Sequence, residues 1–174
     1  MFNISVSTTN MLANNVDCYA YIVEKNFETT VIAEEIKKAC PELLSVIKQK
    51  KFVGAALESI IVPFVNNNKL VYCCLIGLGE AESKSGIRVI ERYRRAVGQL
   101  VKVVSGAGCT SVALELISPS KDISLEYLAE QVAIICNVAQ YHFNDFITEK
   151  SRKTENIDVT LVVDEKNKKL QPSI

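Results

Sequence analysis

Residues 70–76 read LVYCCLI and lead directly into Gly77-Leu78-Gly79. A near-continuous apolar run of this length predicts a β-strand covered on both faces, as in the interior of an α/β sheet. The glycines are expected to end the strand. From about Ser85 the apolar residues follow a helical period that includes Val97 and Val104. A buried strand followed by an amphipathic helix indicates a layered α/β domain.

The same two patterns alternate along the rest of the chain. Further strands are expected at 2–7, 18–23, 59–64, 111–117 and 158–163. Further helices are expected at 32–39, from Pro41 to about 51, and over 128–146. This order predicts an α/β fold with a mixed, largely parallel central sheet flanked by helices. The opening pair of strands, joined by a short connection, is expected to supply the antiparallel part.

Several residues mark the ends of these elements. Pro63 has no backbone donor, so its strand should end there or lie at a sheet edge. A turn is expected at 66–68, which reads Asn-Asn-Asn. Gly106 is expected to cap the helix before it, and Ser124 the helix after it. We expect the domain to span residues 1–163 and the polar tail, 164–174, to begin a linker.

The composition excludes some classes of function. Acidic and basic residues balance at 20 each, which disfavours nucleic acid as a partner. No apolar run approaches the roughly 20 residues of a membrane span. The N-terminus lacks the features of a signal peptide, and the six cysteines show no metal-binding spacing. Reduced, buried thiols and a cytoplasmic location are expected.

Two groups of residues could face a ligand or a partner. Gly77 and Gly79 follow a buried strand, where α/β sheets often bind phosphate, but the third glycine of a dinucleotide-binding loop is missing. A tight exit from the strand is the alternative. Arg88, Arg92 and Arg95 form a basic stripe on the following helix, which is either a solvated face or a contact to another domain or subunit.

Other titratable residues do not combine into a catalytic set. His142 is the only histidine, with Asp145 and Glu149 near it on one helix. Asp122, Glu126 and Glu130 surround a helix start, where acidic residues favour the helix dipole. No GxSxG nucleophile motif occurs. The sequence therefore assigns no catalytic residue and no metal ligand.

Three stretches form a further pattern along the chain. They are Phe52-Val53-Gly54 leading into residues 59–63, residues 75–80 followed by 93–98 (YRRAVG), and residues 128–130 (LAE) followed by 141–146. Together they resemble the N-terminal domain of the M17 leucyl (cytosol) aminopeptidases. Gln131 stands where the family usually has glycine after Ala-Glu, and Phe146-Ile147 where Tyr-Lys is typical.

The resemblance implies a macro-domain-like fold and a supporting role. In the family, two divalent metal ions, manganese or zinc, are held by a C-terminal catalytic domain, and the enzymes assemble as hexamers. None of those metal-binding residues maps onto this chain. We therefore expect no cofactor in these residues, no activity from this stretch alone, and as partners a catalytic domain of the same chain and further copies of the protein.

Two alternatives remain open. A free-standing macro-like module could bind ADP-ribose or a related nucleotide, although Gly106-Ala107-Gly108, its nearest glycine run, resembles a helix terminator. DNA binding through the face of Arg88, Arg92 and Arg95 is the other, and the neutral net charge disfavours it.

Overall fold

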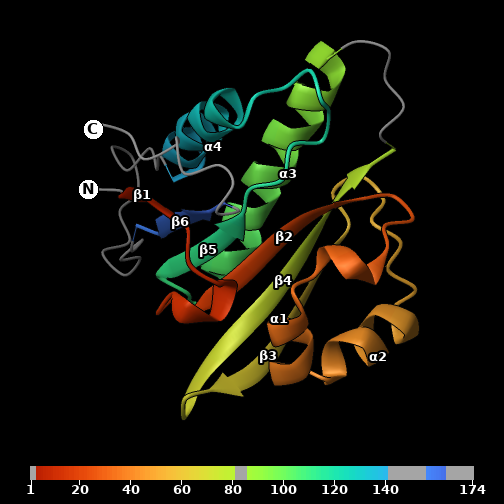
Figure 1. The fold of residues 1–174 in the computed structure, drawn as a ribbon, viewed down its shortest axis with the longest axis vertical. Helices are drawn as coiled ribbons and strands as arrows, with labels where there is room; N and C mark the ends of the chain where they lie inside the picture. The colour runs from red at the N-terminus through yellow and green to blue at the C-terminus, as the bar shows by residue number, and fades with distance from the viewer. Residues whose placement is uncertain (1–2, 81–85, 141–155, 164–174) are drawn as a thin grey trace, which may run out of the picture.

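One mixed sheet organises the chain, with helices on both of its faces (Figure 1). The computed structural model describes residues 3–80, 86–140 and 156–163. The strands are β1 (Ile4–Ser7), β2 (Cys18–Glu24), β3 (Ser59–Asn66), β4 (Lys69–Gly79), β5 (Ser111–Glu115) and β6 (Asp158–Val162). The α-helices are α1 (Glu34–Ala39), α2 (Glu42–Gln49), α3 (Gly86–Gly106) and α4 (Leu125–Gln140). Two short 3₁₀ turns, η1 (Met11–Ala13) and η2 (Thr29–Val31), follow β1 and β2.

The strands lie in the order β1-β6-β5-β2-β4-β3. All neighbours are parallel except β3 and β4, so the expectation of a mixed, largely parallel sheet is confirmed. The expectation of an antiparallel opening pair is wrong. β1 pairs in parallel with β6, with Ile4 opposite Val159, while β2 lies between β5 and β4. Long-range pairing at the far edge of the sheet outweighs the short connection between the first two strands.

The antiparallel part is the β3–β4 hairpin. Asn67 and Asn68 form its two-residue turn with φ angles of 48° and 61°. Asparagine tolerates these left-handed angles, and the twist of such a turn matches that of the strands. β4 continues through Gly79 and does not end at Gly77 as expected.

β3 is the outer strand of the sheet, as Pro63 suggested, and it runs on to Asn66. Pro63 lies opposite Tyr72, whose N–H donates to the Asp17 carbonyl on the β2 side. The backbone nitrogen of Pro63 therefore faces outward, away from β4. The absence of an N–H group at Pro63 therefore removes no hydrogen bond between β3 and β4.

Two hydrophobic cores lie on opposite faces of the sheet. On one face α3 and α4 bury Tyr93, Leu100 and Leu128. On the other, η1, α1 and α2 cover side chains such as Tyr19 and Leu75. All six cysteines are free and buried, and the adjacent Cys73 and Cys74 point into different cores. None of the described helices is long and apolar enough to cross a membrane.

The ends of the two long helices are set by local chemistry. Ser124 caps α4 as expected, because its Oγ accepts the N–H of Tyr127. The C-terminal cap of α3 is Gly108 and not Gly106. Gly108 has a φ of +75°, its N–H donates to Ser105, and Cys109 donates to Val104. This is a Schellman motif, in which the left-handed residue is Gly108, two positions beyond the expected Gly106.

Candidate functional site

The chain leaves the carboxyl ends of neighbouring strands in different directions. After β2 it crosses to the α1 face, whereas after β4 and β5 it crosses to the face of α3 and α4 (Figure 1). Such a divergence leaves a crevice at the carboxyl edge of the sheet, where α/β proteins commonly bind ligands. Two hollows lie at this edge of the described structure.

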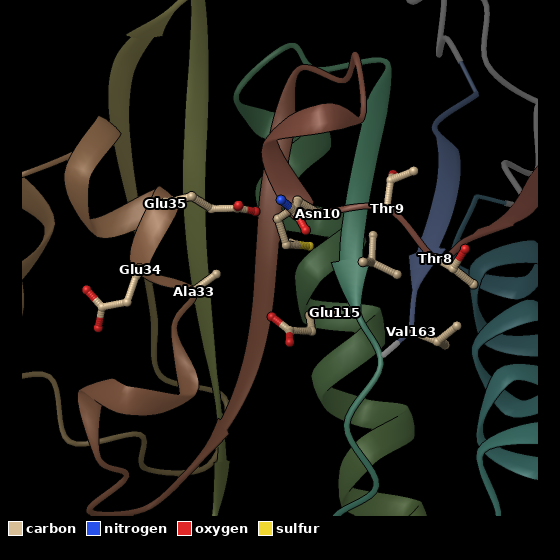
Figure 2. Close-up of a pocket in the computed structure, with 10 residues that line it drawn as sticks. Thr8, Thr9, Asn10, Ala33, Glu34, Glu35, Glu115 and Val163 are labelled. Atoms are coloured by element: carbon tan, nitrogen blue, oxygen red, sulfur yellow. The ribbon is translucent and has the colours of Figure 1, made fainter. Parts of the chain in front are cut away.

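The first hollow, the acidic cleft, has a volume of about 340 Å³. Its lining residues are Thr8, Thr9, Asn10, Met11, Ala33, Glu34, Glu35, Glu115, Val162 and Val163 (Figure 2). Glu35 and Glu115 enter it from α1 and from the end of β5. Glu35 accepts the N–H of Leu12, and Glu34 is paired with Lys37. None of the described residues of this lining is basic, which disfavours a phosphate ligand.

The second hollow, the β2-end cavity, has a volume of about 450 Å³. It is lined by Ile22, Val23, Glu24, Lys25, Asn26, Phe27, Glu28, Thr30, Val31, Leu78, Tyr93, Ile117, Ser118 and Pro119. Its walls are mostly apolar, with charged residues contributed by the end of β2 and the segment that follows it. The Tyr93 hydroxyl is buried and has no hydrogen-bond partner among the described residues. Burial raises the pKa of Tyr93 well above its usual value, so the hydroxyl stays protonated.

Gly77 and Gly79 hold a loop against the end of β4. A Cβ on Gly77 would lie 1.9 Å from the Ala55 carbonyl oxygen, and Gly79 has a φ of +86°. The N–H groups of Gly77 and Gly79 donate to Glu58 and Gly54, and their carbonyls accept from Leu57 and Lys25. The structure thus gives both glycines a role in backbone packing. A ligand contact at either one stays a prediction.

The arginines of the predicted stripe lie together on α3. Arg88 and Arg95 are exposed and Arg92 is half-buried. Arg95 donates to Glu91 at 3.3 Å, and Arg92 donates to the Glu80 carbonyl. The stripe is thus partly engaged within its own domain, and its contact to a partner stays a prediction.

Two polar contacts were not singled out from the sequence. Asp17 accepts hydrogen bonds from Thr110 and Ser111 and pairs with Lys69, which ties together the beginnings of β2, β4 and β5. Arg94 donates its Nε to the buried Gln131 at 2.8 Å, between α3 and α4. The only signal for the second contact was that Gln131 departs from the family's glycine.

The remaining candidates give no catalytic or metal-binding cluster. His142, Asp145 and Glu149 lie outside the described residues. Asp122, Glu126 and Glu130 are exposed around the start of α4. In the described part of the chain, no group of three or more histidines, cysteines or acidic residues is placed to hold a metal ion.

The sheet order and the helices on both faces define a macrodomain-like α/β protein. Macrodomains of DarG have this fold: that of Mycobacterium tuberculosis superposes with a TM-score of 0.61 at 11% identity, over 93% of this chain and 98% of the macrodomain. The particular family is given by the sequence. The model of the "Cytosol aminopeptidase family, N-terminal domain" matches residues 22–150, and the chain belongs to this family.

Solved structures of larger enzymes agree with this assignment. A mutant of tomato leucine aminopeptidase superposes with a TM-score of 0.70 at 16% identity, over 94% of this chain and 32% of that one. The bottromycin maturation enzyme BotP matches with a TM-score of 0.57 at 16% identity, over 87% of this chain and 28% of that one. The chain thus spans about a third of these enzymes. Comparison with curated protein sequences finds no match.

Proposed function

We propose that this chain is the non-catalytic N-terminal domain of a leucyl-type metalloaminopeptidase that removes N-terminal amino acids from peptides. The observation that carries the proposal is the family match over residues 22–150. The likeness to one third of a leucine aminopeptidase supports it. In this proposal two divalent metal ions, manganese or zinc, belong to a catalytic domain, where they activate water and polarise the scissile carbonyl.

The proposed role of these residues is assembly and regulation in the cytoplasm. The partners would be a catalytic domain of the same chain and further copies of it, as a hexamer. The basic stripe of Arg88, Arg92 and Arg95 is the surface that we assign to such a contact. Arg88 and Arg95 are exposed and can meet carboxylates of a partner.

The test is a hydrolysis assay with leucine p-nitroanilide in the presence of manganese or zinc. We expect no turnover by the purified chain, whereas a full-length M17 aminopeptidase provides the positive control. Metal-dependent turnover that rises in proportion to the concentration of this chain would refute the proposal, because it would require an active site within these residues.

A second candidate function is a free-standing module for ADP-ribose or a related nucleotide. The likeness to complete DarG macrodomains favours it. The acidic cleft opposes it, since a diphosphate would meet glutamates there. Calorimetry with ADP-ribose separates the two candidates: micromolar binding supports this second one, and no binding at millimolar ligand removes it.

A further inference from the structure

We propose that the β2-end cavity binds a small molecule that combines an apolar body with a protonated amino group. The proposal concerns this chain alone and does not depend on the aminopeptidase assignment. Two observations carry it: the size and lining of the cavity, and the charge balance at its wall.

The cavity has the size and the wall of a ligand site. Its volume of about 450 Å³ lies within the range of small-molecule pockets. Ile22, Val23 and Leu78 come from the ends of β2 and β4, and Ile117 from the segment after β5. Side chains on sheet strands form a rigid wall, and an apolar wall stabilises a ligand by removing its hydrocarbon surface from water.

The charges at the wall favour a cation. The half-buried Glu24 carboxylate has neither a hydrogen bond nor an ion pair within the described ranges, and Glu28 accepts only a long contact of 3.4 Å from Thr30. Lys25 is compensated, since its Nζ lies 2.6 Å from the Glu80 carboxylate. The uncompensated charge is therefore negative. A phosphate or carboxylate ligand would be repelled, and an ammonium group attracted.

Tyr93 also lines the cavity, and its hydroxyl oxygen is fully buried. The polar recognition therefore falls to the Glu24 carboxylate, which is unpaired among the described residues and can accept hydrogen bonds from an ammonium group. A branched aliphatic amine offers both this cation and the hydrocarbon body that the wall requires.

The probe is 3-methylbutylamine, titrated into the ¹⁵N-labelled chain and followed by amide chemical shifts. We expect saturable shifts at residues 22–31 and 117–119. The alcohol of the same skeleton, 3-methylbutanol, should bind at least about tenfold more weakly, because it lacks the charge. ADP-ribose serves as the anionic comparison and should cause no shifts in these residues. Equal binding of amine and alcohol, or no saturation by the amine at tens of millimolar, would overturn the proposal.

One variant and a matched control test the role that we assign to Glu24. Glu24→Gln keeps the shape of the side chain and should weaken amine binding about tenfold while leaving alcohol binding unchanged. Glu126→Gln, an exposed position on α4, is the matched control and should change neither. Unchanged amine affinity in folded Glu24→Gln would contradict the assignment, and amide spectra of each variant verify that it is folded.

Discussion

A single carboxylate, that of Asp17, connects three strands at their amino ends. Its Oδ1 lies 2.7 Å from Lys69 Nζ, and its Oδ2 accepts the Thr110 N–H at 2.9 Å and the Ser111 N–H at 3.1 Å. Partial burial by itself raises the pKa of Asp17. The Lys69 ammonium and the hydrogen bonds from Thr110 and Ser111 outweigh that effect and hold the pKa well below its usual value of 3.8.

Asp17→Asn should destabilise the fold by about 2 kcal/mol, since hydrogen bonds to a charged group are lost. The lowered pKa of the folded state also predicts the pH dependence. The contribution of Asp17 to the free energy of unfolding is complete above the pKa of Asp17 in the unfolded chain. It is lost as the pH falls below about 4, towards the pKa of Asp17 in the folded protein. Urea unfolding at pH 7 and at pH 3 measures both effects. Asp122→Asn, at an exposed position, is the control, and equal loss of stability in both variants would contradict this role.

At the scale of elements, the junction between β4 and the loop of residues 52–58 depends on Gly77. Gly77→Ala should destabilise the protein by about 3 kcal/mol or more, because its Cβ would overlap the Ala55 carbonyl. Gly98→Ala is the matched control. On α3 a Cβ at Gly98 meets nothing closer than 3.9 Å, so this change should stabilise the helix by up to about 1 kcal/mol. Thermal unfolding compares the two variants. A tolerated Gly77→Ala would show that the loop can shift away from β4.

The same junction shows what the sequence could and could not predict. The apolar run of β4 and the helical period of α3 located both elements, because they depend on local patterns. The role of Gly77-Leu78-Gly79 depends on contacts with Gly54 and Ala55, more than twenty positions away, which no local pattern contains. Strand order has the same limit, since β1 meets β6 only in the folded sheet. The two hollows at the carboxyl edge depend on the same strand order, so local sequence patterns could not predict them either.

At the scale of the whole molecule, the six cysteines are distributed over both cores. Burial raises the pKa of Cys136 to about 12, and burial with the charge of Asp17 raises that of Cys109 to about 11. Because the thiolate is the reactive form, thiols in the folded protein should react with Ellman's reagent at least about a hundredfold more slowly than free cysteine at pH 7. In concentrated guanidinium chloride all six should react at once. A thiol that reacts rapidly in the folded state would contradict its burial.

Pro63 has a consequence for how the protein can associate. Beyond β3, an added strand would find no amide donor at the position of Pro63, within the stretch from Ser59 to Asn66. The pairing of β3 with a strand of another molecule is therefore disfavoured, as at other sheet edges that avoid edge-to-edge aggregation. If copies of this protein ever join through backbone pairing, the first strand, at the opposite border, is where they would do so.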